Sequence, residues 1–376
     1  MRVLAAIVLV AWALALIRTL VNLLLIPRLR RGAPTAGPRV SVIIPARDEE
    51  RRIELTVRAF LSQTYEDFEV IVVNDRSTDA TAAILERIAR QNERLVVVSG
   101  EEPPPGWLGK PWALHQGSRR ATGELLLFVD ADIFYAPETL GAAVEEMEKS
   151  RVAMVCLLPY VEMAGFWEHV AMPMLSITVF TFLPTWLANR TTIQLLSIGG
   201  GTGNLIRRRD YEEVGGHETL KDAVVDDVGL ARIVRRSGRK TSAVRADDFV
   251  SVRMYHGGNE IVDGFTKNMF AVLGRRYGFA ALSVAAGFVF HILPYILAVL
   301  GYGFAIATVV LITISRGVLF QQLRYRFHYA LWAHPLMVVF WGWITIRSAW
   351  FTGIRRRLLW RGRVYDASST RFGGDQ

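Results

Sequence analysis

The stretch Leu125-Leu-Leu-Phe-Val-Asp-Ala-Asp132 is a short apolar run that ends in two acidic residues. A continuous apolar run of this length, without helical spacing, is typical of a strand buried on both faces of a parallel sheet. In open α/β sheets, ligands lie beyond the carboxyl ends of the strands, so Asp130 and Asp132 are expected at the mouth of a site. The stretch therefore predicts an α/β fold with an acidic site after this strand.

The spacing of Asp130 and Asp132 points to a metal. Two carboxylates about 4–5 Å apart repel each other by roughly 3–4 kcal/mol at an effective dielectric near 20. A divalent cation removes this repulsion, and Mg²⁺ is commonly bound by one or two carboxylates together with substrate phosphates. The alternative is a solvated acidic turn, because Asp-x-Asp is a short and common pattern. This stretch alone leaves both interpretations open.

The composition indicates a soluble domain joined to membrane segments. The chain has 376 residues, 51% of them hydrophobic and only 21% charged, with a mean hydropathy of +0.25. Its net charge is +9, and several Lys and Arg clusters flank apolar spans, which favours anionic lipid headgroups over nucleic acid as partners. The single cysteine, Cys156, excludes an internal disulfide and a cysteine-based metal site.

An N-terminal membrane anchor is predicted for Val3–Ile26, which is long enough to cross a bilayer. Arg18 interrupts this span and is expected to snorkel or to meet a polar partner. A cleaved signal peptide is the less favoured alternative, because apolar sequence continues past Arg18. The basic residues Arg28, Arg30 and Arg31 then place the following domain in the cytoplasm by the positive-inside rule.

The C-terminal region is predicted to hold further membrane segments. Phe279–Ile314 is long enough for a hairpin of two spans, the basic stretch Arg316–His328 follows, and Ala330–Thr352 is a third apolar segment. Three full crossings would place the basic residues of Arg355–Arg363 outside, against the positive-inside bias. A re-entrant or interfacial segment is the alternative, with Ala330–Thr352 as the first candidate.

Between these regions, strands alternate with helices, which predicts βαβ units and a parallel sheet. The expected elements are a strand at Val40–Pro45, a helix at Glu50–Leu61, a strand at Phe68–Val73, a helix carrying Ile84, Leu85 and Ile88, and a strand at Leu95–Ser99. Phe166–Leu187 is apolar but contains Pro173 and Pro184, so interfacial or substrate-lining helices are expected there. A helix carrying Lys267 is expected over Glu260–Gly274.

Two loops could approach a ligand. Glu101–Trp112 is rich in Pro and Gly and is expected to be a loop, in which Lys110 either reaches substrate phosphates or is an ordinary surface lysine. Gly199–Gly203 permits close backbone approach to a ligand, with a long flexible turn as the alternative.

Asp75 follows a strand as Asp130 does, so both are expected at the same sheet edge. Its carboxylate could accept hydrogen bonds from a nucleobase N–H or from ribose hydroxyls. The alternative is an Asx-turn with Ser77 or Thr78.

Asp226 and Asp227 begin a predicted helix, where acidic residues are common for structural reasons alone. His217 and His256 have no partner at metal-ligand spacing and are predicted to be non-catalytic.

Four motifs together resemble glycosyltransferase family 2 in order and spacing. They are Val40-Ser-Val-Ile-Ile-Pro-Ala-Arg-Asp-Glu-Glu, Val72-Val-Asn-Asp-Arg-Ser-Thr-Asp, Gly123-Glu-Leu-Leu-Leu-Phe-Val-Asp-Ala-Asp, and Asp226-Asp-Val-Gly-Leu-Ala-Arg with Gly238 downstream. The resemblance covers roughly Val40–Arg275 and implies a GT-A fold, a nucleotide-sugar donor and inversion at the anomeric carbon. Gly106–Leu114, Gly199–Arg208 and Arg253-Met-Tyr resemble the membrane-anchored members that glycosylate polyprenoid lipids, such as carotenoid- or hopanoid-associated transferases.

The resemblance also implies roles for individual residues. It implies that Asp130 and Asp132 bind the metal and that Asp227 is the general base. The residues implied in nucleotide-sugar contacts are Pro45, Arg47, Glu49, Asp75, Lys110 and Asp130. The residues implied in acceptor or loop contacts are Gly201, Thr202, Gly203, Asp226 and Lys267. Asn74 replaces the commoner Asp of the nucleotide loop, and Asp226 replaces the usual Glu. The Gln-x-x-Arg-Trp signature of processive synthases is absent, and Phe265-Thr-Lys-Asn stands near its place.

The resulting prediction is a mostly parallel, Rossmann-like GT-A sheet with helices on both faces and terminal transmembrane helices. The predicted parts are an anchor (1–27), a linker (28–38), a transferase domain (39–276), transmembrane or interfacial helices (277–352) and a basic tail (353–376). The predicted activity is transfer of one sugar, with a UDP-sugar favoured and Mg²⁺ or Mn²⁺ as metal, to a membrane lipid. The predicted location is a bacterial-type inner or plasma membrane, with no nucleic-acid partner. A processive polysaccharide synthase, a nucleotidyltransferase and a non-enzymatic lipid-binding scaffold are the alternatives.

Overall fold

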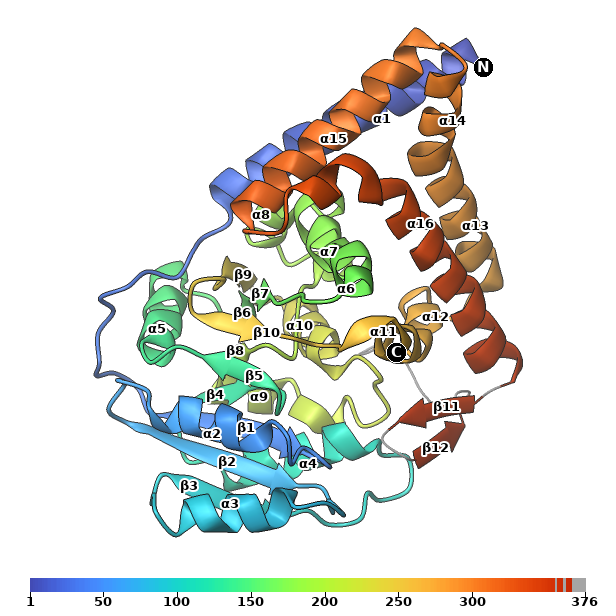
Figure 1. Ribbon diagram of the computed structural model, residues 1–376. Helices are drawn as coiled ribbons and strands as arrows, with labels where there is room; N and C mark the ends of the chain where they lie inside the picture. The colour runs from blue at the N-terminus through green and yellow to red at the C-terminus, as the bar shows by residue number, and fades with distance from the viewer. Residues whose placement is uncertain (356, 361–362, 367–376) are drawn as a thin grey trace. The chain divides into compact units, whose positions relative to one another are not determined.

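The computed structural model describes residues 1–355, 357–360 and 363–366 (Figure 1). The described chain divides into two compact units. The helical unit comprises Met1–Leu25, Met163–Trp186 and the described part of Tyr255–Ser368, and the sheet unit comprises Ile26–Glu162 and Leu187–Met254. This division differs from the linear domain ranges predicted from the sequence, because Met163–Trp186 and the residues from Tyr255 to 276 group with the apolar helices.

The sheet unit is built on a seven-stranded sheet in the order β3-β2-β1-β4-β8-β6-β9. Its strands are β1 (Val40–Ala46), β2 (Phe68–Asn74), β3 (Leu95–Ser99), β4 (Leu125–Phe128), β6 (Met154–Leu158), β8 (Asn204–Arg207) and β9 (Thr241–Arg245). Only β8 runs antiparallel to its neighbours, β4 and β6. The predicted mostly parallel α/β sheet is therefore confirmed.

Helices cover both faces of this sheet (Figure 1). The alternation along β1 divides its side chains between two cores: Val42 and Ile44 pack on one face, and Ile43 packs on the other. The first core is completed by α2 (Ile53–Leu61), α3 (Thr81–Ala89) and α5 (Thr139–Ser150), and the second by α4 (Gly109–Arg120) and α10 (Asp226–Arg236). A second sheet of three short strands contains β5 (Ile133–Tyr135), β10 (Val250–Val252) and β7 (Tyr160–Val161).

Two local predictions were wrong, and the one antiparallel strand of the main sheet was missed. Lys110 does not lie in a loop, because α4 begins at Gly109 and tolerates Pro111 in its first turn. The helix expected over Glu260–Gly274 is two helices, α11 (Gly257–Thr266) and α12 (Met269–Val272). Strand β8 was not predicted at all, because four residues after a glycine loop give too short a pattern.

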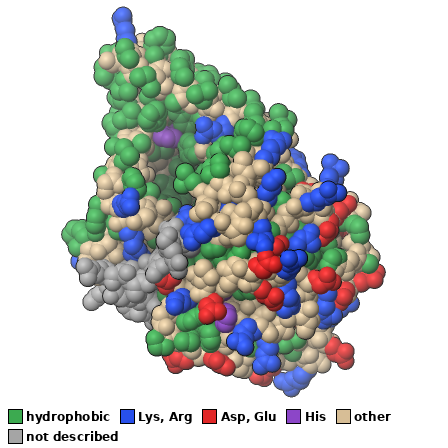
Figure 2. All heavy atoms as spheres, turned by 180° about the vertical axis from the view of Figure 1, so that it is seen from behind, with side chains coloured by type: hydrophobic (Ala, Val, Ile, Leu, Met, Phe, Trp, Pro, Cys, Tyr) green, Lys and Arg blue, Asp and Glu red, His purple; other side chains and the backbone are tan. Residues whose placement is uncertain are grey.

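The helical unit has four helices long and apolar enough to cross a membrane. They are Arg2–Leu25 (α1), Tyr277–Val299 (α13, Tyr277–Gly287, η4, Phe288–Ile292, and α14, Leu293–Val299), Gly303–Gln322 (α15), and His328–Ile354 (α16, His328–Ser348, with η5, Ala349–Ile354). Their exposed side chains are largely apolar; Leu24 is 81% and Val299 88% exposed. Figure 2 shows hydrophobic side chains gathered over this part, whereas Lys, Arg, Asp and Glu are scattered over the sheet unit.

Two details of the apolar helices bear on the sequence predictions. Arg18 does meet a polar partner, since its Nη1 donates to the carbonyl oxygen of Phe182 at 2.7 Å. The basic stretch that was expected to begin at Arg316 does not separate two segments there, because α15 continues through Arg316 to Gln322.

The apolar stretch Phe166–Leu187 folds into short helices within this region. They are α6 (Phe166–Ala171), α7 (Pro173–Ile177), η1 (Thr178–Phe182) and α8 (Thr185–Ala188). Asn22 of α1 stabilises the irregular turn after η1, because its Nδ2 donates to the carbonyl oxygens of Phe180 at 2.9 Å and Leu183 at 2.7 Å. The role of these helices in holding a substrate stays a prediction. Beyond them, β11 (Arg357–Trp360) and β12 (Arg363–Asp366) form an antiparallel pair, and the end of the predicted basic tail lies outside the described residues.

Candidate active site

Asp130 is fixed just beyond the end of β4. Its backbone N–H donates to the carbonyl oxygen of Gly201 at 2.8 Å, which ties it to the glycine loop before β8. Its carboxylate pairs with Lys110 Nζ at 2.8 Å, and the Asp130 side chain is still 39% exposed. The end of the central strand therefore carries a carboxylate that is both anchored and accessible.

Lys110 is the cation at the centre of the site. Leu108 N–H donates to Lys221 O at 2.7 Å, which fixes the start of α4 and directs Lys110 from its first turn. Lys110 Nζ lies 2.8 Å from Asp130 and 3.4 Å from Asp226. Burial alone would lower the pKa of Lys110, but the surrounding carboxylates raise it well above its ordinary value, so Lys110 remains charged.

Asp226 and Asp227 open α10 and have opposite electrostatic environments. Burial tends to raise the pKa of Asp226, but Lys110 and His217 hold it below its usual value. Burial, opposed by Lys110 and reinforced by Asp226 and Asp130, raises the pKa of Asp227 to about 6. The pair thus places an acid whose charged form is stabilised beside one that can exchange a proton near neutral pH, an arrangement typical of acid–base sites.

His217 lies behind this pair, a placement that the sequence prediction missed. It is 1% exposed, and its Nε2 lies 3.9 Å from Asp226 Oδ2. Its other ring nitrogen, Nδ1, lies 2.9 Å from Tyr211 Oη, and Phe128 packs edge-on against the ring at 4.7 Å. No spacing in the sequence signals this contact, because it depends on the turn before α10 folding back onto β4.

The glycine loop packs against the acids through its backbone. A Cβ on Gly201 would overlap the Asp130 carboxylate, and one on Gly199 would overlap the Asp227 carbonyl oxygen. Thr202 Oγ1 donates to Leu157 O at 2.7 Å, which holds the loop on the sheet. The loop therefore packs closely against the two acids, and its predicted approach to a ligand stays a prediction.

These residues line one pocket of the sheet unit. Its polar lining is contributed by Lys110, Asp130, Asn204, His217, Asp226 and Asp227, with Gly200 and Gly201 at its edge. Asn204 Nδ2 donates to Asp227 O at 3.2 Å, so β8 also positions the start of α10. The pocket brings together Lys110, Asp130 and the acid pair, which lie far apart in the sequence.

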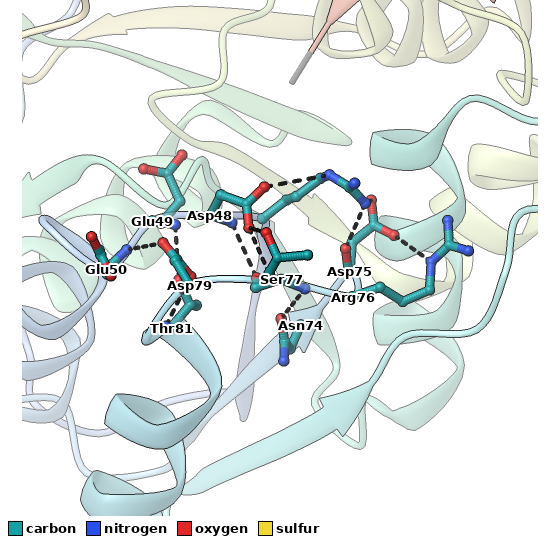
Figure 3. Close-up of polar contacts among 11 residues, drawn as sticks. Asp48, Glu49, Glu50, Asn74, Asp75, Arg76, Ser77, Asp79 and Thr81 are labelled. Atoms are coloured by element: carbon teal, nitrogen blue, oxygen red, sulfur yellow. Dashed lines mark hydrogen bonds and ion pairs between the residues drawn. The ribbon is translucent and has the colours of Figure 1, made fainter. Parts of the chain in front are cut away.

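A second polar cluster lies at the carboxyl ends of β1 and β2 (Figure 3). Asp48 Oδ1 accepts the Thr78 N–H at 2.7 Å, and Asp48 N–H donates to Ser77 Oγ at 3.1 Å. Glu49 N–H donates to Thr81 Oγ1 at 2.8 Å. The loops after the two strands are therefore joined by hydrogen bonds.

Asp75 is 6% exposed in this cluster, between two guanidinium groups (Figure 3). Arg47 Nη1 donates to Asp75 O at 3.0 Å and lies 3.7 Å from its carboxylate, and Arg76 Nε lies 3.6 Å from the other carboxylate oxygen. The side chain that closes the turn is Asn74, whose Oδ1 accepts the Ser77 N–H at 3.1 Å. Arg47, Glu49 and Asp75 thus share this loop cluster, and Pro45 lies two residues before Arg47 on β1, in register with Val73 of β2.

Asp132 differs from Asp130 in its surroundings. Its carboxylate pairs with Arg52 Nη1 at 3.0 Å and is 19% exposed. Neither acid is simply solvated, because each faces a cation. Within the described ranges, no three His, Cys, Asp or Glu side chains converge in a metal-binding cluster. Two carboxylates from one loop nevertheless fit a Mg²⁺ or Mn²⁺ ion whose remaining ligands come from substrate phosphates.

The remaining predicted site residue, Lys267, belongs to the helical unit, where it directly follows α11 as its C-cap. It does not line the pocket, and its predicted role stays a prediction.

Gly201→Ala is expected to lower kcat/KM by about 10²-fold, because the added Cβ must displace the Asp130 carboxylate. Steady-state kinetics on the purified full chain checks this. Gly278→Ala is the matched control, since a Cβ there has no atom within 4 Å and the residue lies in a helix. Equal activity of the two variants would show that the contact between the loop and Asp130 has no functional role.

Comparisons with known proteins extend these observations. Residues 41–215 match the family described as Glycosyl transferase family 2. The 4,4'-diaponeurosporenoate glycosyltransferase of Staphylococcus aureus strain MRSA252 is 25% identical over 348 residues, covering 88% of each chain. The protein of the same name in strain USA300 is 25% identical over 344 residues, again covering 88% of each.

Among solved structures, the mannosyltransferase PcManGT from Pyrobaculum calidifontis, in complex with GDP-Man and Mn²⁺, aligns with a TM-score of 0.55. It is 20% identical in sequence, and the alignment covers 92% of this chain and 98% of that one.

Proposed function

We propose that the chain transfers one sugar from a nucleotide-sugar to a membrane lipid with inversion, because residues 41–215 match glycosyl transferase family 2 and the fold resembles that of a solved mannosyltransferase. The observation that carries this proposal is the pocket in which Lys110 lies between Asp130 and the pair Asp226–Asp227. It supplies a proton acceptor and a fixed cation in one place, as a direct displacement requires.

The proposed mechanism is a single in-line displacement. Asp227 takes the proton of the acceptor hydroxyl as that oxygen attacks the anomeric carbon, and its pKa near 6 leaves it mostly ionised at neutral pH. Lys110 stays charged and offsets the negative charge that develops on the leaving diphosphate. If the acceptor presents a carboxylate, no proton has to be removed and Asp227 only orients it.

Asp130 and Asp132 are the residues that would hold a divalent metal. Such an ion would supply further positive charge for the departing diphosphate. In the same proposal Asp75 and Arg47 contact the nucleoside, and a UDP-sugar is the expected donor. The complex of PcManGT with GDP-Man and Mn²⁺ supports a nucleotide-sugar and a metal in general, without specifying either here.

A lipid acceptor is supported by the helical unit and by the relatives. Its four apolar helices are suited to a bilayer, and the Staphylococcus aureus relatives are named for transfer to diaponeurosporenoate. We propose that the protein sits in a bacterial-type inner membrane. By the positive-inside rule, the basic residues Arg28, Arg30 and Arg31 favour a cytoplasmic sheet unit.

A donor screen tests the proposed function. The full chain in detergent is incubated with UDP-, GDP- or dTDP-sugars, Mg²⁺ or Mn²⁺, and a total bacterial lipid extract, and products are read by mass spectrometry. The expected result is a lipid whose mass rises by one sugar residue. A long polymer would point to a processive synthase, pyrophosphate release to a nucleotidyltransferase, and no turnover with any donor to a lipid-binding scaffold.

The pH dependence of kcat/KM should report Asp227 when the acceptor is a hydroxyl. Since the base must be ionised, kcat/KM is expected to fall about tenfold per pH unit below about 6 and to level off above it. Lys110→Met should shift this limb to higher pH, because Lys110 lowers the pKa of Asp227. Initial rates measured across this range, with donor affinity measured in parallel, check the prediction. If the acidic limb of Lys110→Met lies at the same pH as that of the wild type, the titrating group is not Asp227.

A further inference from the structure

Arg316 is a buried arginine inside the helical unit. It lies in α15, within a segment apolar enough to span a membrane, and it is 1% exposed. Its Nε, Nη1 and Nη2 atoms are all buried, and none has a hydrogen-bond partner among the residues that the structure describes. Because an arginine side chain remains protonated in proteins, this is a buried positive charge with unused donors.

The ring of Trp12 packs against this guanidinium, and two histidines from other helices pack against Trp12. The Trp12 ring of α1 lies 5.3 Å from Arg316 Cζ. His291 of η4 and His334 of α16 meet through Nδ1 and Nε2 at 3.2 Å, and both stand edge-on to Trp12 with ring centroids 5.2 and 5.6 Å away. The remaining ring nitrogen of His334, Nδ1, is also buried without a hydrogen-bond partner among the described residues.

The apolar helices supply no counter-ion for Arg316. Residues 1–25 and 277–354 contain no Asp or Glu. Cation–π contact with Trp12 offsets only part of the cost of burying a charge, and a buried charge is normally paired with an opposite one. The cluster formed by Arg316, His334, His291 and Trp12 therefore combines buried polar atoms and a positive charge inside apolar helices that carry no acidic residue.

The position of Arg316 limits what could supply that anion. Arg316 precedes the end of α15 by six residues, which corresponds to about 9 Å of helix. Helical side chains slant toward the N-terminus of their helix, so its guanidinium points further from that end and reaches Trp12, halfway along α1. A headgroup carried by an amphiphile that enters the bilayer would reach this depth.

We propose that this cluster binds the oxyanion of a membrane amphiphile, a carboxylate or a phosphate carried on an apolar chain. A planar guanidinium pairs with such a group through two parallel hydrogen bonds, and the imidazole of His334 can add a third. His291 is partly exposed, which leaves the cluster an approach from the surface of the helical unit. The proposal concerns binding alone and does not depend on the transferase reaction.

Equilibrium binding to the full chain tests this without a nucleotide-sugar. The protein is placed in phosphatidylcholine nanodiscs, and binding of radiolabelled oleic acid is compared with that of methyl oleate, its uncharged ester. We expect saturable binding of oleic acid at one site per chain and at least about tenfold weaker binding of the ester. Equal binding of acid and ester by the wild-type protein would overturn the proposal, even if no variant could be made.

Variants then assign the binding to Arg316. Arg316→Gln is expected to weaken oleic acid binding about tenfold or more, whereas Arg316→Lys should retain part of it. Arg326→Gln, which removes an exposed arginine of the same unit, should bind as the wild type does. Wild-type affinity in a folded Arg316→Gln variant would contradict the assignment.

Competition identifies the source of the oxyanion. Displacement of oleic acid by phosphatidylglycerol, but not by inorganic phosphate, would extend the site to lipid phosphates. If neither phosphatidylglycerol nor inorganic phosphate displaces oleic acid, the site is restricted to carboxylates. This outcome and displacement by phosphatidylglycerol alone both support a membrane amphiphile as the ligand. Displacement of oleic acid by inorganic phosphate would overturn the lipid part of the proposal, because a soluble anion would then be enough to occupy the site.

Discussion

Asp227→Asn is expected to lower sugar transfer to a hydroxyl acceptor by about 10²–10⁴-fold, the usual contribution of a general base. Asn cannot accept the hydroxyl proton, yet it has almost the same shape and can still accept the Val228 N–H that now reaches Asp227 Oδ1 at 2.7 Å. The loss should therefore appear in kcat, while donor affinity stays within a few-fold of the wild type. Single-turnover kinetics with a saturating donor, together with calorimetric donor titration, measures the two quantities separately.

The control for Asp227→Asn is a matched change elsewhere in the sheet unit. Asp67→Asn alters a carboxylate that is 52% exposed and pairs with Arg39, so its effect on transfer should be small. A loss of donor binding equal to the loss of transfer would show that Asp227 acts on the donor. A folded Asp227→Asn enzyme with full activity on a hydroxyl acceptor would remove Asp227 from the mechanism.

Asp132→Asn is expected to abolish metal-dependent transfer and to weaken metal-dependent donor binding by at least about tenfold. A neutral amide cannot replace a carboxylate ligand of Mg²⁺ or Mn²⁺ without loss of charge. The measurement is donor titration with and without the metal, followed by the transfer rate at saturating metal.

Arg52→Gln distinguishes the metal role of Asp132 from a purely structural one. Asp132 pairs with Arg52 at 3.0 Å, so if this ion pair is all that Asp132 provides, both variants should behave alike. The proposal instead predicts that Arg52→Gln keeps its metal dependence, because the carboxylate remains. Retention of full, metal-dependent activity by Asp132→Asn would remove Asp132 from the proposed metal site.

The sequence predicted the elements whose signals are local. Strand β3 was placed at its observed bounds and β1 and β2 to within one residue, because buried runs flanked by polar loops leave little freedom in register. The helix start at Asp226–Asp227 was also correct, since acidic residues at a helix N-terminus are a short-range signal.

The missed features depend on contacts between distant parts of the chain. The start of α4 was not predicted, because it lies in a run rich in Pro and Gly. For the same reason the position of Lys110 between two carboxylates was not predicted. His217 has no sequence signal, because its role depends on Asp226 lying 3.9 Å away across a turn. Arg316 was predicted to begin a basic stretch between two apolar segments, whereas the packing of α1, α15 and α16 buries it inside the helical unit.

The pKa values of Asp226 and Asp227 shift in opposite directions, which shows that position in the sequence alone does not determine the role of an acidic residue. Both open one helix, Asp226 buried and Asp227 half-buried, and their sequence context does not distinguish them. Their difference comes from Lys110 and His217, which stabilise the charge on Asp226, while burial raises the pKa of Asp227. The resemblance to a family pointed to the second acid, and the electrostatics of the pocket give a physical reason for it.

The most direct test of the account is the structure of the lipid product. Wild-type protein, a nucleotide-sugar with an α-linked sugar and a lipid extract should yield a lipid carrying one sugar, which mass spectrometry detects. Proton NMR of that product should show a β-linked anomeric centre, as a single displacement at the Asp227 pocket requires. A product with the α configuration would contradict the proposed mechanism, and absence of any glycosylated lipid with every donor would contradict the proposed function.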